Sequence, residues 1–245
     1  MNPIIDVLKS HRSIRQFTDQ PIDQALFAEI IMSGQAAASS NFLQGVTIIR
    51  VTDRAKRAQL RQLSGNQPYV ESAAEFLVMC ADLNRAAQCC DLHDKQATTG
   101  FTEQFILATV DTALAAQNIC VAAESVGLGI CYIGAVRNHP DQVSELLNLP
   151  DNVYPVFGLC LGWPDQAPEV KPRLPLALML HENAYPSDID RAQIEAYDAV
   201  MVDYYKTRTD NKKTAGWSEQ MSGLLSREAR PHMLEFLRAR GFMQK

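Results

Sequence analysis

Residues 102–126 constrain the fold of this chain more than any other segment. If the segment is a helix, apolar side chains cover much of its circumference, among them Ile106, Val110, Leu114 and Ile119. A helix that is apolar on most sides is normally buried on several of them. Its small residues at 113, 115 and 116 permit close approach of a second helix. The segment is therefore either the central helix of a monomer core or a helix at a dimer interface.

Short strands and helices are predicted on both sides of this helix in the sequence. Apolar and β-branched runs predict strands at 46–51, 75–80, 131–134 and 154–162. Capping residues and periodicity predict helices at 3–10, from about 23, at 53–63 and, after an irregular segment at 165–175, at about 188–206, 217–227 and 231–239. Thr102 is expected to cap the long helix and Gly127 to end it. Because strands and helices do not alternate regularly, the order predicts an α+β fold. We expect a single domain spanning 1–245, with a mostly helical excursion at about 186–240.

Charge and cysteine usage argue against several classes of function. The net charge of −5 argues against a binder of nucleic acid or of an anionic membrane. The N-terminus carries no signal segment, and no apolar run approaches the roughly 20 residues that span a bilayer. Six scattered cysteines without a C-x-x-C pair indicate reduced thiols, and the five histidines lack metal-ligand spacing. We therefore expect a cytoplasmic protein without a metal site.

Two basic segments are candidate phosphate sites. His-Arg-Ser-Ile-Arg at 11–15 places alternate side chains on one side if the backbone is extended. Lys-Pro-Arg-Leu-Pro at 171–175 carries two cations on a backbone that prolines restrict, so less entropy is lost when a phosphate binds. Taken alone, each segment is more simply interpreted as a solvated surface turn or loop. The interpretation as a phosphate site is strengthened only if the fold brings the two segments together.

Two further segments can contact a flat ligand. The glycine-rich run at 127–134 offers backbone N–H groups without a Cβ in the way. The small polar residues at 38–44 can wrap a ligand edge, and Phe42 can cover an aromatic face; an ordinary loop remains the alternative. The chain lacks the G-x-G-x-x-G, G-x-x-x-x-G-K-[ST] and G-x-S-x-G patterns. A Rossmann dinucleotide site, a P-loop and a serine hydrolase are therefore disfavoured.

These segments, in this order, resemble the FMN-dependent nitroreductase family, and most closely its oxygen-insensitive, NADPH-preferring branch. The resemblance covers essentially the whole chain, and the ordered set of motifs is more specific than any one of them. The matching segments are His-Arg-Ser-Ile-Arg (11–15), Ser-Ser-Asn-Phe-Leu-Gln (39–44), Gly-Leu-Gly-Ile-Cys-Tyr-Ile-Gly (127–134), Phe-Gly-Leu-Cys-Leu-Gly-Trp-Pro (157–164), Lys-Pro-Arg-Leu-Pro (171–175), Tyr-Tyr-Lys-Thr-Arg (204–208) and Ser-Arg-Glu-Ala-Arg-Pro (226–231).

The resemblance implies an intertwined α+β homodimer with an antiparallel core sheet surrounded by helices. It implies one noncovalent FMN in each of two clefts at the dimer interface. The residues assigned to FMN in this way are His11, Arg12, Ser13, Arg15, Ser39, Ser40, Asn41, Phe42, Gln67, Tyr132, Ile133, Gly134, Ala135, Lys171 and Arg173.

Within that set the resemblance implies distinct roles. The phosphate end is assigned to His11, Ser13, Lys171 and Arg173, and the pyrimidine side of the ring to Arg15 and Gln67. The strip along the flavin is assigned to Ile133 and Gly134, and the contribution of the partner subunit to Ser39, Ser40 and Phe42. Arg208 is assigned to the 2′-phosphate of NADPH. Two lysines, Lys212 and Lys213, are further candidates for phosphate contact or part of a solvated loop.

Two positions depart from the family pattern. Ala135 stands where a second glycine is usual, so a positive φ there would cost energy. Asn41 stands where a serine is usual and is expected to alter the rim of the cleft.

The implied function is NADPH-dependent reduction of nitroaromatics and quinones, small aromatic electron acceptors, by two-electron ping-pong transfer. The flavin carries out the electron chemistry, so no protein side chain is needed as a catalytic nucleophile, acid or base, and Arg15 tunes the flavin. Reduction of free flavin, chromate or ferric iron is the alternative activity. A noncatalytic flavin-binding redox sensor is the alternative from another class.

Overall fold

The protein is described by a computed structural model, which covers residues 2–207 and 213–245. The chain divides into two compact units, Met1–Pro168 with Arg230–Lys245, and Glu169–Ala229. The first unit contains the sheet, and the second contains α8 (Arg191–Thr207) and α9 (Trp217–Leu225). The predicted helical excursion overlaps the second unit. The prediction of one domain stays a prediction.

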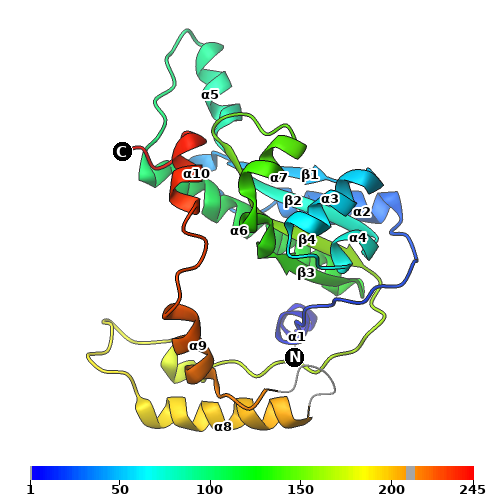
Figure 1. Ribbon diagram of the computed structural model, residues 1–245, viewed down its shortest axis with the longest axis vertical. Coiled ribbons are helices and arrows are strands. Elements are labelled where there is room, and N and C mark those ends of the chain that lie inside the picture. The colour runs from blue at the N-terminus through cyan, green and yellow to red at the C-terminus, as the bar shows by residue number, and fades with distance from the viewer. Residues whose placement is uncertain (1, 208–212) are drawn as a thin grey trace. The chain divides into compact units, whose positions relative to one another are not determined.

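A four-stranded antiparallel sheet forms the centre of the first unit, in the order β1-β2-β4-β3 (Figure 1). The sheet confirms the predicted α+β class and the antiparallel core sheet. The largest differences in strand boundaries are that β2 continues beyond residue 80 and β3 begins before residue 131; β1 and β4 each differ from the prediction by one residue. Gly134, predicted at the end of β3, instead begins the short 3-10 helix η2 (Gly134–Asn138). The strands are β1 (Val46–Arg50), β2 (Glu75–Asp82), β3 (Gly129–Ile133) and β4 (Val153–Gly162).

β2 lies in the interior of the sheet and is buried on both faces. Phe76 and Val78 point into one apolar core, and Leu77 and Met79 point into the other. A strand with two buried faces reads as a continuous apolar run and shows no alternation with polar residues. This is why Glu-Phe-Leu-Val-Met-Cys predicted a central strand.

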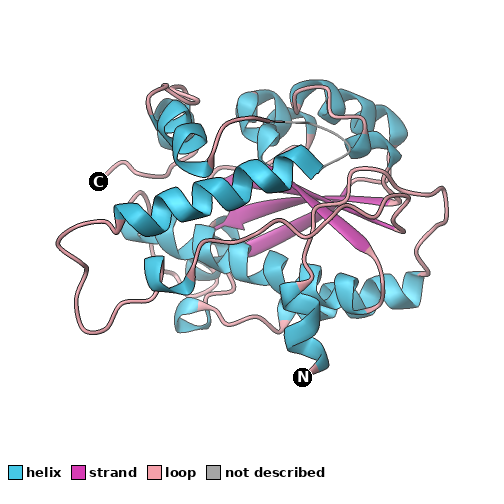
Figure 2. Ribbon diagram, turned by 90° about the horizontal axis from the view of Figure 1, so that it is seen from below, coloured by secondary structure: helices cyan, strands magenta, loops and turns pink. Residues whose placement is uncertain are grey.

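Helices cover both faces of the sheet (Figure 2). On the face of Leu77 and Met79 lie α2 (Gln24–Gln35) and α6 (Thr102–Ser125). On the opposite face lie α3 (Arg54–Leu63), α4 (Tyr69–Ser72) and α7 (Pro140–Leu146). The predicted helix starts near residues 3, 23 and 53 are confirmed, and the side chains of Asn2, Asp23 and Asp53 cap α1 (Pro3–Lys9), α2 and α3.

α6 is the predicted long apolar helix, and it packs as a core helix. Its side chains at Ala116, Ile119 and Cys120 contact the core beneath the sheet. By length and composition alone, α6 is also apolar enough to cross a membrane. The predicted cap is wrong, because the Thr102 hydroxyl donates to the Lys245 carbonyl and Gln104 accepts from the N–H that precedes the helix. The predicted stop at Gly127 is confirmed, since its φ is +86°.

The three C-terminal helices predicted from periodicity are confirmed as α8, α9 and α10 (Met233–Ala239), with shifted ends. Three described helices were not predicted: α4, α5 (Asn84–Asp91) and α7. None of the residues of α5 is buried, so no apolar period marks it. The other two are short, and α7 starts at Pro140, a residue suited to the first turn of a helix.

Candidate functional site

The segment 11–15 lies along the edge of β3. Ser13 forms a parallel bridge with Ile130, and the N–H of Ile14 donates to the Ile130 carbonyl at 2.9 Å. The Ile14 side chain is buried in the first unit. In an extended backbone the adjacent side chains, Ser13 and Arg15, then point to the opposite side. The predicted extended row is therefore confirmed at these positions.

Arg15 reaches the end of the loop that joins α3 to α4, where Tyr69 begins α4. Burial raises the pKa of the Tyr69 hydroxyl, while a hydrogen bond from Arg15 and its positive charge act to lower it. Burial also raises the pKa of the Cys131 thiol on β3, and the charge of Arg15 opposes that rise. Arg15 therefore lies close to both the loop at Tyr69 and strand β3.

Gln67 supplies an unsatisfied acceptor in the same loop. Its side-chain carbonyl oxygen is buried and has no hydrogen-bond partner among the described residues. Leaving such a group unpaired costs about 1–3 kcal/mol. The pyrimidine side of FMN offers an N–H donor for this oxygen, and carbonyl oxygens for the nearby Arg15. The residues present therefore fit the flavin that the sequence implies.

The end of β3 lies two residues after Cys131, the β3 residue that the charge of Arg15 influences. Ile133 is buried, whereas Tyr132, Gly134 and Ala135 are partly exposed. The Tyr132 ring packs edge-on against Phe157 of β4, with centroids 5.0 Å apart. Ala135 does not adopt a positive φ. Its replacement of a usual glycine therefore introduces no left-handed strain.

His11 has a partner that the sequence did not predict. Its Nδ1 lies 2.7 Å from Oε1 of Glu124 on α6. This contact fixes the ring and engages one of its two nitrogens. Arg12 is exposed. The phosphate role of His11 stays a prediction.

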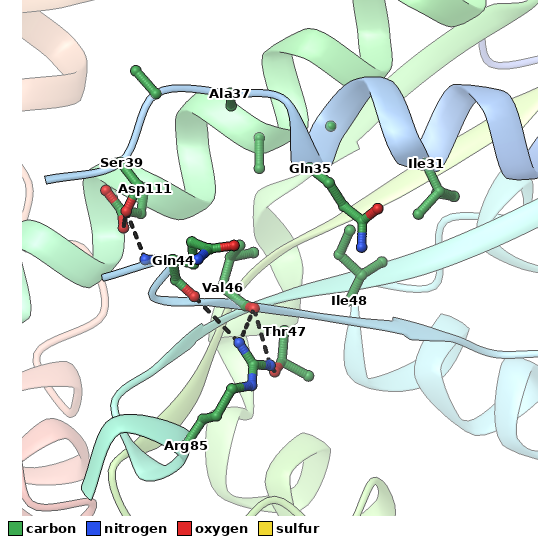
Figure 3. A pocket seen from close by; sticks show the side chains of 13 residues that line it. Ile31, Gln35, Ala37, Ser39, Gln44, Val46, Thr47, Ile48, Arg85 and Asp111 are labelled. Carbon is green, nitrogen blue, oxygen red and sulfur yellow. Dashed lines mark hydrogen bonds between the residues drawn. The ribbon is translucent and has the colours of Figure 1, made fainter. Parts of the chain in front are cut away.

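The segment 39–45 is held by a buried carboxylate on α6. Asp111 accepts a hydrogen bond from the Ser39 hydroxyl at 2.5 Å, from the Ser40 N–H at 3.2 Å and from the Gly45 N–H at 3.0 Å. Figure 3 shows Asp111 and Ser39 pointing toward one another at the rim of a pocket of about 380 Å³. Ser39 therefore already has a partner within its own chain.

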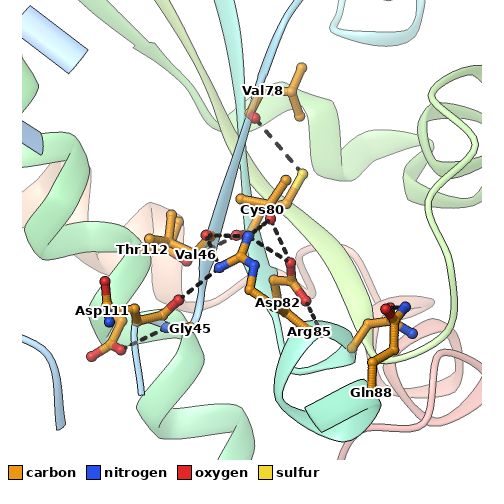
Figure 4. Close-up of polar contacts among 12 residues, drawn as sticks. Gly45, Val46, Val78, Cys80, Asp82, Arg85, Gln88, Asp111 and Thr112 are labelled. Atoms are coloured by element: carbon orange, nitrogen blue, oxygen red, sulfur yellow. Dashed lines mark hydrogen bonds and ion pairs between the residues drawn. The ribbon is translucent and has the colours of Figure 1, made fainter. Parts of the chain in front are cut away.

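The start of β1 is fixed from its other side by Arg85 of α5 (Figure 4). Arg85 donates to the carbonyl oxygens of Gln44 and Val46 and, at 2.6 Å, to the Thr47 hydroxyl. It also pairs with Asp82 at 3.3 Å. The backbone that follows the 39–45 segment is thus tied to α5 as well as to α6.

One chain does not bring the segments 11–15 and 39–45 together. They adjoin β3 and β1, which are the opposite edges of the sheet. Through β2, the start of β1 lies level with Tyr154 at the start of β4, whereas Ile130 pairs with Leu161 near the end of β4. The two segments are therefore separated both across the sheet and along it.

In the second unit two lysines converge on Tyr205 of α8. Lys171 Nζ lies 5.5 Å and Lys213 Nζ 5.6 Å from the centroid of its ring. Burial raises the pKa of the Tyr205 hydroxyl, but a hydrogen bond from Lys171 and the two lysine charges outweigh it, so the pKa lies below its ordinary value. Neither lysine forms an ion pair with a carboxylate in the described part of the chain. Two cations at one place suit a phosphate.

α8 anchors the 171–175 segment at a second point. The Tyr197 hydroxyl donates to the Pro172 carbonyl at 2.9 Å. Burial raises the pKa of Tyr197, and the nearby charge of Arg173 opposes that rise. Tyr197, Met201 and Tyr205 are buried at a spacing of four residues along the helix. That spacing is a sequence signal for the helix face that packs near the basic segment.

The remaining predicted contacts are only partly described. Arg208 and Lys212 lie outside the described residues. The segments 11–15 and 171–175 belong to different units. All six cysteines are free thiols, and the described residues contain no group of three potential metal ligands.

Sequence reasoning missed several residues that position the site. Asp111 is the one charged residue of α6 between Glu103 and Glu124, which is a signal in the sequence, because a charge in an apolar helix needs a buried partner. Tyr69 carries no comparable local signal. It is identified by contacts with residues distant in the sequence.

Two family models match this chain. The model described as nitroreductase family matches residues 8–163, and the model described as nitroreductase family, C-terminal domain, matches residues 171–245. Together they match most of the chain, including the segments 11–15 and 171–175.

Full-length relatives and a solved structure agree with these matches. The chain is 48% identical to an NADPH-flavin oxidoreductase of Vibrio harveyi, over 100% of both chains. It is 47% identical to an oxygen-insensitive NADPH nitroreductase of Salmonella typhimurium, over 99% of both chains. The solved structure of the Vibrio harveyi NADPH:FMN oxidoreductase complexed with NAD⁺ superposes with a TM-score of 0.92, at 46% identity and 100% coverage of both chains.

Proposed function

This chain belongs to the nitroreductase family, and from that premise we propose that it is an NADPH-dependent, FMN-containing oxidoreductase that reduces nitroaromatic and quinone-like acceptors two electrons at a time. The observation that carries the proposal is the unpaired buried oxygen of Gln67, two residues before Tyr69, together with the charge of Arg15 beside Tyr69 and Cys131 of β3. The names of the two full-length relatives support it, since both are NADPH-dependent oxidoreductases.

When bound, FMN accepts two electrons with a hydride from NADPH and passes them to the second substrate. Arg15 holds a permanent positive charge beside the pyrimidine side of the ring, where reduction places negative charge. At an effective dielectric constant of about 20, a cation 4 Å away contributes about 4 kcal/mol before desolvation. The side-chain carbonyl oxygen of Gln67 would orient the ring by accepting a hydrogen bond from its N–H.

We assign the phosphate end of FMN to His11, Ser13, Lys171 and Arg173. The Ser13 side chain lies on the same side of its segment as Arg15. The contacts of Tyr197 and Tyr205 support Lys171 and Arg173 as a held pair of cations. Held cations lose less conformational entropy on binding a phosphate.

We infer a homodimer in which Ser39, Ser40 and Phe42 complete the flavin cleft of the partner subunit. Within one chain these residues lie at the opposite edge of the sheet from Arg15. On α6 an apolar row stays exposed at Ile106, Val110 and Leu114, with 47%, 49% and 41% of each residue accessible. A second copy of the chain would cover such a row.

The preference for NADPH is assigned to Arg208, with Lys213 as a second cation. NADPH differs from NADH by one phosphate far from the transferred hydride, so discrimination needs a cation away from the flavin ring. Lys213 is held near Tyr205 and donates to Gln220 at 3.0 Å. A cytoplasmic location is assigned on the six free thiols.

Reduction of free flavin is the second candidate function, because one full-length relative is named for it. Chromate and ferric iron stay alternative acceptors of the same site. A noncatalytic redox sensor is disfavoured, because both relatives are named for their reductase activity.

Steady-state kinetics with a nitroaromatic, a quinone and free FMN, each with NADPH and with NADH, tests the proposal. We expect double-reciprocal plots to be parallel, because both substrates use one face of the flavin in turn, and we expect NADPH to be preferred. Higher kcat/KM for the nitroaromatic or the quinone supports the first candidate. Higher kcat/KM for free FMN supports the second. Intersecting lines would contradict the two-step cycle.

A further inference from the structure

Asp111 is a buried charged residue whose described hydrogen bonds all go to one loop. Only 3% of the residue is accessible, and it lies in the otherwise apolar middle of α6. Oδ2 accepts from Ser39 (Figure 3) and from Gly45 (Figure 4). Oδ1 accepts from the Ser40 N–H. Burying a carboxylate is costly unless hydrogen bonds compensate for lost water. The three donors of the loop provide that compensation.

The loop that Asp111 holds has a strained backbone. Asn41, Phe42 and Gln44 have φ values of 50°, 58° and 53°, in the left-handed region that side chains other than glycine rarely adopt. Asparagine tolerates this region better than most residues, which gives a physical reason for Asn41 at its position. Phenylalanine and glutamine do not share that tolerance. Such strain persists only where surrounding contacts impose it.

The Ser39 hydroxyl transmits the hold to the middle of the loop. It donates to Asp111 and accepts the Gln44 N–H at 2.6 Å. The conformation it helps to maintain leaves Phe42 79% accessible. An aromatic side chain on a fixed backbone, turned outward, is suited to contact something outside its own chain.

We propose that Asp111 is a positioning residue for the flavin cleft of the partner subunit, acting through the 39–45 loop that it holds in its strained conformation. The proposal rests on the proposed function, because that function places Ser39, Ser40 and Phe42 in the partner's cleft. Asp111 does not touch the flavin. Its effect is exerted on the cleft of the partner subunit, because within its own chain the 39–45 loop lies at the opposite edge of the sheet from Arg15.

Asp111→Asn tests the hold on the loop, with Thr112→Val as the matched control. The amide NH₂ of asparagine faces at least one of the loop donors, so a hydrogen bond is lost with little change in volume. Thr112 is the next residue of α6, is fully buried, and bonds the carbonyls of Cys80 and Ala108 without touching the loop. Hydrogen exchange of the amides at 40–45 should rise in Asp111→Asn and stay unchanged in Thr112→Val.

The same pair of variants separates positioning from general stability. We expect the Kd for FMN of Asp111→Asn to rise about 10-fold, as expected when a buried hydrogen bond is lost, and that of Thr112→Val to stay within about twofold at a similar loss of Tm. Equal rises in both variants would overturn the proposal. So would unchanged exchange and an unchanged Kd in Asp111→Asn.

A mixed dimer tests whether Asp111 acts across the interface. One chain carries Asp111→Asn and the other Arg15→Glu, and the pair is purified through two different affinity tags. If Asp111 acts on the partner's cleft, both defects fall in one cleft and the other is intact, so native mass spectrometry should find one FMN per dimer. If Asp111 acts on its own cleft, both clefts are damaged and no FMN should be retained at the same concentration. That result would overturn the proposal.

A glycine substitution tests whether backbone strain in the loop is the cause, and it distinguishes loss of the loop conformation from general misfolding of Asp111→Asn. Gln44→Gly removes the side chain that makes a left-handed backbone costly. In the Asp111→Asn background it should recover part of the lost FMN affinity, and a purely structural role for Asp111 predicts no recovery. If the wild-type chain is monomeric or binds no FMN, the proposed function has failed; rising exchange at 40–45 in Asp111→Asn would still show the hold on the loop.

Discussion

Among single residues, Arg15 supplies the positive charge that tunes the flavin in the proposed function. It is a permanent cation beside Tyr69 and Cys131, and Tyr69 follows two residues after Gln67, whose buried oxygen is unpaired among the described residues. The predicted motif gave its position on an extended segment. Its neighbours in the fold come from elements that begin more than fifty residues later in the chain, so no local pattern reveals them.

Arg15→Gln should slow flavin reduction by NADPH about 10- to 100-fold. The substitution removes the charge and keeps hydrogen-bond donors, and each 1.36 kcal/mol of lost stabilisation slows the step about tenfold. Anaerobic stopped-flow absorbance measures the rate. Arg15→Lys, which retains a charge, should keep most of it. Equal rates in wild type and Arg15→Gln would show that the charge of Arg15 does not assist flavin reduction.

Buried thiols give the protein a defined response to alkaline pH. Burial raises the pKa of Cys120 from its ordinary value of 9.0 to about 12. A thiol with a raised folded pKa stabilises the fold fully below pH 9, and this stabilisation is lost as pH rises towards 12. At about pH 10 the loss is about 1.4 kcal/mol per thiol.

Urea unfolding at about pH 7 and pH 10 measures this loss of stability. Cys120→Ala should unfold with a smaller difference between the two pH values than wild type. Cys89→Ala, which changes an exposed thiol, should show the wild-type difference. If Cys120→Ala retained the full pH dependence, the destabilisation would come from other groups.

At the scale of elements, the packing of α2 on α6 depends on small residues. Ala115 and Ala116 are buried, and Gly34 of α2 lies against Ala115 and Ile119. A Cβ at Gly34 would lie 2.6 Å from Ile119 Cγ1 and 3.2 Å from the Ala115 carbonyl oxygen. The sequence predicted a close helix approach from the alanines. Which helix would approach could not be predicted, because α2 and α6 are far apart in the chain.

Gly34→Ala should therefore lower the free energy of unfolding by about 1–3 kcal/mol, since overpacking forces atoms apart. Gly223→Ala in α9 is the matched control, because its nearest atom lies 3.9 Å away. The control should be neutral or slightly stabilising, as alanine favours helix. Urea unfolding compares the two. A stable Gly34→Ala would show that α2 and α6 pack less closely.

The exposed row of α6 makes a prediction about assembly. Val110→Asp places a charge in the middle of that row and should dissociate the dimer, with loss of FMN. Val200→Asp is the control, because Val200 lies in helix α8 and is likewise 49% accessible. Light scattering should report about the mass of one chain, 27.2 kDa, for Val110→Asp and twice that mass for wild type and control. A dimeric Val110→Asp would place the interface elsewhere.

For the molecule as a whole, the sequence predicted most helices and strands, but it predicted less well which of them contact one another. The strands were predictable because β2 and β4 are continuous apolar runs, and α6 because of its length. By contrast, α5 has no buried residue and α7 is a single short stretch with a proline start. Neither produces a hydrophobic period that local reasoning can detect.

The candidate site shows the same division between motif and contact. The motifs at 11–15 and 171–175 gave the cations, and the resemblance gave their ligand. Glu124 holds the first of these motifs and Tyr197 the second, while Asp111 holds the 39–45 segment, and all three are partners in space that lie in no motif. Their roles follow from the physics of burial: a charge or hydroxyl inside a core must find a partner.

The most direct test of the central claim is an anaerobic titration of the purified protein with NADPH, followed by release of its chromophore. We expect a yellow protein that is bleached by one equivalent of NADPH per flavin, and one FMN per chain in the supernatant after denaturation. The proposed function would be contradicted if the protein held only FAD or did not bind FMN. It would also be contradicted if the flavin stayed oxidised after NADPH was added.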